Sequence, residues 1–380
     1  MTTVSTNTQT TNTAASNSPA TTAATQNAPA TDTLTTAHPA SVELISRGRR
    51  SRRRRRVIVM TALALVAAAL FAASLMVGRT FYPPADVLGV ILGQDVAGAS
   101  FTVGRLRLPR AVLAVLTGVC FGIGGVTFQT MLRNPLASPD IIGISSGASA
   151  AAAFAIVVLG LGGAQVSVFA IVMGIAVALA IYLLAYRGGV VGTRLVLIGI
   201  GTAAMLNAAT NYILKTAPQW ELQEAMRWIT GSLNGASWEQ VQPVLVACLV
   251  FAPVLLLKSR DLSMLRLGDD TASALGVRTE LTRIVLIVAA VGLIAFATAV
   301  AGPIAFVAFL SGPIAARLVG PHGSPLVPAA LVGVVLVLGA DLVGQYAFGS
   351  RYPVGVITGV LGAPYLIYLI ARSNRTGGSL

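Results

Sequence analysis

Charged side chains are scarce in this sequence. Only 10% of its 380 residues are charged, whereas 55% are hydrophobic, and the mean hydropathy is +0.80. A soluble globular domain carries about 25% charged residues. This composition therefore excludes an ordinary soluble protein and indicates a chain with several membrane spans.

Residues that commonly carry out chemistry are also rare. The two cysteines, Cys120 and Cys248, lie inside apolar runs, so we predict neither a disulfide framework nor a metal site. The only lysines are Lys215 and Lys258, and neither lies in a glycine-rich phosphate loop. We therefore expect no catalytic residues, no ATPase site and no cofactor in this chain, and a membrane-embedded enzyme is disfavoured.

The positive charge is concentrated in one place, which argues against nucleic acid as a partner. The net charge is +13, but eight of the 26 basic residues lie between Arg47 and Arg56, directly before an apolar run. A basic cluster beside a span predicts a cytoplasmic anchor at the lipid surface.

The residues before this cluster have a different composition. Residues 1–45 are rich in Thr, Ala, Ser, Asn and Pro, and they cannot bury enough apolar area to become ordered. We predict a disordered cytoplasmic tail over 1–56 with an Arg-rich end. The segment does not read as a signal peptide, because the apolar run follows residue 56 without an evident cleavage site.

Long apolar runs dominate the rest of the chain. A helix needs about 20 apolar residues to cross the hydrocarbon core, and the runs predict an all-α polytopic membrane protein with about ten transmembrane helices. The predicted spans are 57–78, 108–129, 141–161, 165–186, 195–214, 238–257, 283–301, 303–319, 326–346 and 353–371. The eighth contains Gly312-Pro313, so we expect it to be tilted, broken or partly re-entrant.

The distribution of charge predicts the orientation. With the N-terminus inside, ten spans place most basic residues on the inner side, as the positive-inside rule requires. The even number also places the C-terminus inside. The sequence thus predicts a transmembrane domain over 57–372 and a short cytoplasmic tail over 373–380.

A few polar residues interrupt the spans, where they are costly and often functional. Asn207 and Asn211 share one helix face, so they either line a pathway or bridge helices. With Gln129 they are the candidate pathway residues. Asp341 and Gln345 lie near the predicted outer end, where we expect interfacial solvation of the carboxylate. The glycines of the second span predict tight helix packing.

The loop Lys258–Arg283 carries nine charged residues in 26. Gly268-Asp269-Asp270 is typical of a helix start, because acidic side chains favour the first turn, and Gly276 is a plausible stop. So short a helix is unstable alone in water. It must pack either on the chain's own inner surface or on a partner.

Two other stretches contain helix breakers. Arg133-Asn134-Pro135, followed by Pro139, predicts an inner turn. Gly302-Pro303 interrupts apolar sequence further along the chain.

Six motifs occur in one order along the chain. They are Arg107-Leu-Pro-Arg110, Gln129 with Arg133-Asn-Pro-Leu-Ala137, Gly143-Ile-Ser-Ser-Gly147, Leu267-Gly-Asp-Asp270 with Ala274-Leu-Gly276, Gly302-Pro-Ile-Ala-Phe306, and Pro353-Val-Gly-Val-Ile-Thr-Gly359 with Gly362-Ala-Pro364. In this order they resemble the FecCD family, the permease subunits of ABC importers for iron–siderophores, haem and vitamin B12. The resemblance covers about residues 57–372.

The resemblance implies the fold of a type II ABC importer and a set of partners. These are a second permease subunit, identical or related, two cytoplasmic ATPase subunits that bind ATP and Mg²⁺, and an extracytoplasmic binding protein. Residues that match the family's ATPase-coupling helix are Leu267, Gly268, Asp269, Asp270, Ala274, Leu275 and Gly276.

At the outer face, Arg107 and Arg110 match basic residues at which the binding protein docks. The family often has Arg where this chain has Gln345, and we expect nearby Arg351 to compensate. Outer-loop arginines can also be simple interfacial anchors.

The same resemblance also implies a substrate class and an energy source. The stretch Phe309–Arg317 is similar to members that import catecholate siderophores such as ferric enterobactin. We therefore expect a ferric siderophore as substrate, with haem or vitamin B12 as the alternatives. The rival from another class is an ion-coupled secondary transporter that uses Asp341 as its carboxylate.

Overall fold

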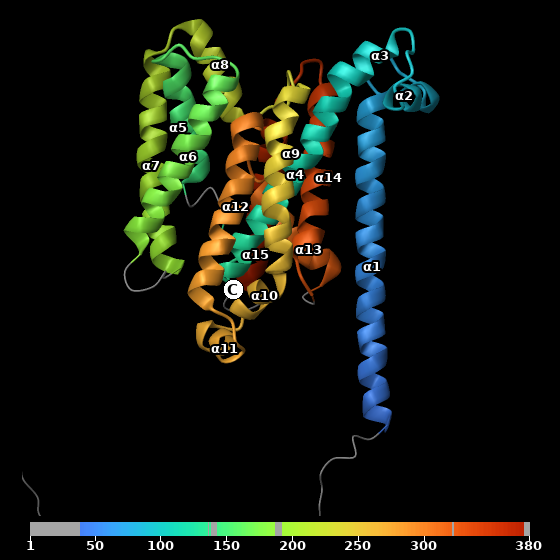
Figure 1. The fold of residues 1–380 in the computed structure, drawn as a ribbon, viewed down its shortest axis with the longest axis vertical. Coiled ribbons are helices and arrows are strands. Elements are labelled where there is room, and N and C mark those ends of the chain that lie inside the picture. Colours follow the sequence, from blue (N-terminus) through green and yellow to red (C-terminus); the bar gives the residue numbers. More distant parts are fainter. Residues whose placement is uncertain (1–38, 136, 138–142, 187–191, 321–322, 376–380) are drawn as a thin grey trace, which may run out of the picture. The chain divides into compact units, whose positions relative to one another are not determined.

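The computed structural model describes residues 39–135, 137, 143–186, 192–320 and 323–375. Within these ranges every regular element is a helix, which confirms the all-α class (Figure 1). Residues 50–380 form one compact unit, and the arrangement below is that of this unit.

Each of the ten predicted spans has a helical counterpart. These helices are α1 (Pro39–Met76), α4 (Leu108–Met131), α5 (Ile144–Val157), α6 (Ala164–Ala185), α7 (Gly192–Thr216), α9 (Trp238–Leu257), α12 (Thr279–Ala301), α13 (Val307–Val319), α14 (Leu326–Tyr346) and α15 (Val354–Arg375). Within the described ranges, seven apolar helices could cross a membrane by length and composition, whereas α5, α13 and the apolar part of α15 are shorter.

Several short helices lie between the spans. α11 (Asp269–Ala274) was expected, but the sequence analysis missed the others. Their shortness, and the mixed polarity of the longest of them, hide them from a search for long apolar runs. They are α2 (Pro84–Ile91), α3 (Ala99–Phe101), the π-helix η1 (Thr102–Arg107), α8 (Gln219–Thr230) and α10 (Ser259–Leu265).

The first helix begins earlier than predicted. α1 starts at Pro39 and runs through the arginine cluster, so the predicted disorder is wrong for residues 39–56. Arginine is a good helix former, and it extends a helix that a span has nucleated. Residues 1–38 lie outside the described residues. At the other end α15 continues to Arg375, which leaves 376–380 of the predicted tail outside them.

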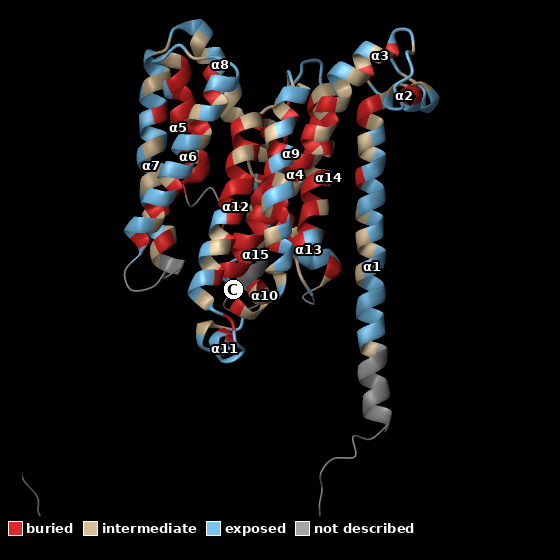
Figure 2. Ribbon diagram, viewed as in Figure 1, coloured by how far each residue is buried: buried red, intermediate tan, exposed pale blue. Residues whose placement is uncertain are grey.

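Helix α4 is the centre of the packed core, and it contacts α9, α12, α13 and α14 (Figures 1 and 2). Its contact with α14 depends on glycine. A Cβ atom added to Gly118 or Gly122 would meet the backbone of Val334 or Ala329, and one added to Gly333 would meet the carbonyl of Gly118. Close backbone approach of this kind is how small residues promote helix packing in lipid.

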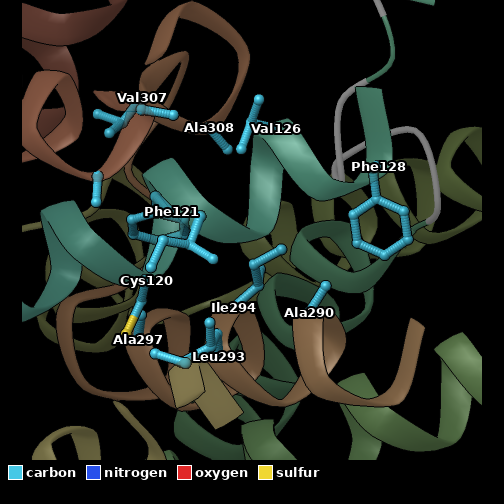
Figure 3. Close-up of a cluster of buried hydrophobic side chains, with 14 of the residues drawn as sticks. Cys120, Phe121, Val126, Phe128, Ala290, Leu293, Ile294, Ala297, Val307 and Ala308 are labelled. Carbon is cyan, nitrogen blue, oxygen red and sulfur yellow. The ribbon is translucent and has the colours of Figure 1, made fainter. Parts of the chain in front are cut away.

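Against α12, the core is made of interlocking side chains. Figure 3 shows Cys120, Phe121 and Phe128 of α4 near residues of α12, among them Leu293 and Ile294. By contrast, α1, α6, α7 and α9 expose many large apolar side chains. Apolar surface of that extent marks a face that water does not cover, as expected of helices that face lipid or another subunit.

Candidate functional site

Two groups of candidate residues lie at opposite ends of α4. Arg110 lies in its first turn and Arg133 directly follows its end. A helix rises about 1.5 Å per residue, so these two residues are roughly a membrane thickness apart. Figure 1 shows α11 at one end of the bundle and α8 at the other.

At the α11 end, the predicted short helix is present. Gly268 is its N-cap with φ 108°, Asp269 and Asp270 occupy the first turn, and Gly276 follows with φ 86°. Ala272 is fully buried against the body of the protein. Burial of one face explains how six residues remain helical, because propensity alone would not hold them.

Asp269 joins α11 to two other elements. It accepts hydrogen bonds from Arg283 Nη2 at 2.7 and 2.8 Å and from Arg133 Nη2 at 3.0 Å. Arg283 belongs to α12, and Arg133 belongs to the turn after α4, where it adopts φ 53°. The structure therefore brings together two motifs that lie 136 residues apart in the sequence.

The other face of α11 is open. Leu267 and Leu275 flank the helix, and their side chains are 62% and 54% exposed. Asp270, Ala274 and Gly276 are exposed as well. An exposed pair of leucines beside a tethered helix is a surface suited to docking on another protein.

A turn forms at the position of the predicted inner turn, over the part that the structure describes. Asn134 N donates to Gln129 O at 3.1 Å, and Ala137 N donates to Asn134 O at 3.0 Å, which closes the chain around Pro135. The second proline, Pro139, lies outside the described residues.

Gln129 has a structural partner that the sequence did not suggest. Its side chain is buried, and Nε2 donates to Phe309 O of α13 at 2.9 Å. It also borders a cavity of about 370 Å³ shared with Arg133, Arg266 and Pro313. Helix α13 starts at Val307, later than the predicted residue 303, and it is continuous through Gly312-Pro313.

Asn207 and Asn211 lie on an exposed face of α7. Neither has a hydrogen-bond partner among the residues that the structure describes. Of the two alternatives for this pair, a bridge to another described helix of the same chain is therefore wrong.

At the α8 end, Arg110 forms an ion pair with Asp341 of α14. Arg110 Nη2 lies 2.7 Å from Asp341 Oδ1, and Nε lies 3.0 Å from Oδ2. The Arg110 Nη1 atom donates to Asn234 Oδ1 at 2.6 Å, and Gln345 Nε2 donates to Asp341 Oδ2 at 2.7 Å. Two parallel bonds between a guanidinium and a carboxylate are the strongest form of such a pair.

This arrangement corrects the expectation for Asp341. Its side chain is only 4% exposed, so interfacial water does not solvate the carboxylate. Arg110 and Gln345 stabilise it instead. The pair could not be inferred from the sequence, because 231 residues separate its members.

Arg107 is also engaged within the chain. Its guanidinium donates to the carbonyls of Leu75 and Met76 at 2.9 Å and of Thr80 at 2.7 Å, and it lies 5.0 Å from the Tyr82 ring centre. It thereby caps the C-terminus of α1, where free carbonyls and the helix dipole favour a cation. Arg351, in contrast, is exposed in the loop after α14.

Two of the motifs meet at this end. Ser232 N donates to Ala301 O at 2.7 Å and Gly355 N donates to Gly231 O at 3.1 Å. Gly231 has φ 78°, and a Cβ there would meet the Pro303 carbonyl, so the approach requires glycine. The 302–306 and 353–364 motifs are therefore packing elements around the 231–232 turn.

The same end contains a cavity of about 480 Å³. Its lining includes Arg110, Arg351, Asn234 and Arg227, the last from the final turn of α8. Arg227 was not among the candidate residues. Its only sequence signal is a cation in a predicted outer loop.

Among the described residues there is no group of three or more His, Cys, Asp or Glu that could hold a metal ion. Spanning helices, a tethered short helix with an open face and a cationic hollow at the opposite end define a multi-pass membrane transport subunit. The chain belongs to the FecCD transport family, which it matches over residues 64–372.

Curated relatives support the same assignment. The chain is 39% identical over 315 residues to the achromobactin transport system permease protein CbrC of Dickeya dadantii, with 82% of this chain and 90% of that protein covered. It is 38% identical over 326 residues to the ferric enterobactin transport system permease protein FepG of Escherichia coli, with 84% and 98% covered.

A solved structure described as an inward-facing conformation of a metal-chelate type ABC transporter has the same fold. Its TM-score is 0.74 at 26% identity, with 83% of this chain and 99% of that chain covered. The chain is thus an ABC importer permease of the cell membrane.

Proposed function

We propose that this chain moves a ferric siderophore across the cytoplasmic membrane, driven by ATP hydrolysis in separate ATPase subunits. Relatives named for achromobactin and ferric enterobactin support an iron chelate as the substrate. The observation that carries the energy-coupling part is the open face of α11, with Leu267 and Leu275 exposed on either side.

In this proposal α11 docks on the ATPase, which binds ATP and Mg²⁺ itself. Asp269 ties α11 to Arg283 of α12 and to Arg133 of the inner turn. A displacement of α11 would therefore reach both α12 and α4, the centre of the core. Chains of packed side chains, hydrogen bonds and ion pairs are the means by which such coupling travels through a protein.

The pathway lies between this chain and a second permease subunit. Asn207 and Asn211 support this placement, because they are exposed on a spanning helix and polar groups there are costly unless a cavity or a partner meets them. Gln129 was the third candidate, and its bond to Phe309 supports a structural role for it.

An extracytoplasmic binding protein would dock at the α8 end. Of the three arginines assigned to docking, Arg107 and Arg110 already have partners within the chain, so Arg351 is the most available. The α11 end would then lie in the cytoplasm. We propose that both termini lie in the cytoplasm as well, and that the Arg-rich part of α1 meets the lipid surface.

Haem or vitamin B12 remains an alternative substrate within the same family. The ion-coupled transporter is less well supported. Its coupling carboxylate would be Asp341, whose oxygen atoms are held by Arg110 and Gln345. These hydrogen bonds give Asp341 a structural role at the contact between α4 and α14.

Two experiments on the complete transporter in proteoliposomes test the proposal. Uptake of a ferric siderophore supplied with the binding protein should require ATP inside and should persist with an uncoupler.

Leu275→Asp should abolish ATPase docking and uptake while the chain still inserts. Leu281→Asp is the matched control, because Leu281 is 55% exposed but lies in the first turn of α12. Uptake that survives ATP removal, or normal uptake in Leu275→Asp, would contradict the proposal.

A further inference from the structure

Two positive charges in the cavity at the α8 end have no counter-charge within the described fold. Arg110 is neutralised by Asp341, whereas Arg227 and Arg351 have no ion pair among the residues that the structure describes. Glu221 and Glu224 lie on the same helix as Arg227, and neither is paired with it there. No carboxylate belongs to the lining, so the hollow is cationic.

Backbone hydrogen bonds connect the segments that carry the two arginines. The turn that follows Arg227 is bound to the start of α15 by Gly355 N–Gly231 O at 3.1 Å. Next to Arg351, Tyr352 N donates to Gly344 O at 2.8 Å. These bonds hold the backbone near both side chains, and neither guanidinium is neutralised by an ion pair among the described residues. A fixed cationic hollow attracts anions strongly.

The chemistry of the ligand follows from the side chains. A guanidinium presents a planar fork of donors that matches paired oxygens, as in a carboxylate or a catecholate. The cavity of about 480 Å³ also falls within the roughly 300–1,000 Å³ typical of small-molecule sites. A hollow of that size fits part of an anionic chelate better than it fits the flat surface of a protein.

We propose that Arg227 and Arg351 form a receiving site for anionic oxygen groups of the transported chelate, with Asn234 as a polar neighbour. This inference rests on the proposed function, because it assumes that an iron chelate enters at this end. It adds a selection by charge within the permease itself, such that an anionic chelate is favoured over a neutral one of similar size.

Equilibrium binding to the complete transporter in nanodiscs tests the site without ATP. The probes are a trianionic ferric tris-catecholate and a neutral ferric trihydroxamate, both labelled with radioactive iron. The wild type should bind the trianionic chelate about tenfold or more tightly than the neutral one, and added salt should weaken that preference. The double variant Arg227→Gln/Arg351→Gln should lose the preference while its affinity for the neutral chelate stays the same.

Arg105→Gln is the matched control, because Arg105 is exposed at the same end in η1 but does not line this cavity. Basal ATPase activity reports correct assembly of each variant. A wild type without charge preference, or a double variant that keeps it, would overturn the site. The proposed site would also be overturned if the double variant weakened association of the unloaded binding protein and left chelate binding intact.

The two hypotheses fail separately. If the wild type imports no ferric chelate with ATP, the proposed function falls, whereas the binding measurement reports on the cationic hollow alone.

Discussion

The side-chain amide of Gln129 donates to the carbonyl oxygen of Phe309 at 2.9 Å. In a regular helix that carbonyl would accept from the residue four positions later, but that residue is Pro313, which has no N–H. Gln129 of α4 thus supplies the donor that α13 lacks. Gly312 makes room for it, since a Cβ there would meet Gln129 Oε1.

Removal of this donor should destabilise the protein. Gln129→Leu leaves a buried carbonyl without a partner, which costs about 1–3 kcal/mol. The thermal unfolding midpoint in detergent should fall accordingly. Pro313→Ala restores an N–H within α13, so the double variant Gln129→Leu/Pro313→Ala should lose less than Gln129→Leu alone. Additive losses would show that the two residues are not coupled through Phe309.

Disruption of the Arg110–Asp341 pair should cost more. Asp341→Asn leaves a largely buried guanidinium without its counter-charge, and such losses are on the order of 3 kcal/mol. Thermal unfolding with detergent-purified protein measures the effect. Gln345→Leu removes one hydrogen bond to the same carboxylate and should cost about half as much. An apolar replacement of both partners, Arg110→Leu/Asp341→Leu, should recover much of the loss, and a double variant worse than Asp341→Asn would contradict this account.

The tether of α11 should matter for coupling rather than for stability. Asp269 is 43% exposed, so Asp269→Asn should change the unfolding midpoint little. It should, however, lower uptake per ATP hydrolysed, because an uncharged amide at this position weakens the ties of α11 to Arg133 and Arg283. Asp270→Asn is the control, since Asp270 is exposed in the same turn and belongs to no ion pair among the described residues. Equal coupling ratios in both variants would rule out the tether.

Glycines in the spans should differ in their tolerance of a methyl group. Gly122→Ala places a Cβ against the Ala329 carbonyl and should destabilise by about 1–3 kcal/mol. Gly201→Ala, on α7, meets nothing within 4 Å and should stabilise its helix by about 0.5–1 kcal/mol. Opposite shifts of the unfolding midpoint are expected. A shift of the same sign in both would contradict the packing explanation.

Much of the local structure could be predicted from the sequence. Apolar runs located ten of the described helices, of which seven are long and apolar enough to cross a membrane. Glycine with acidic residues located α11, with the start of the helix two residues later than observed. The short helices α2, α8 and α10 escaped because they are not long apolar runs. The role of Arg227 escaped because an isolated cation gives no sign of the cavity that it will line.

The sequence by itself determined the helices and their breakers, because hydrophobic length and backbone preference are local properties of the chain. Only the tertiary structure decided what the polar residues do. Gln129 meets Phe309, Arg110 meets Asp341 and Asp269 meets Arg133 across 180, 231 and 136 residues respectively. Helix packing brings each of these pairs together. Around Gln129 and Asp341 water is scarce and a buried polar atom needs a partner, whereas Asp269 and Arg133 meet at the partly exposed surface beside α11.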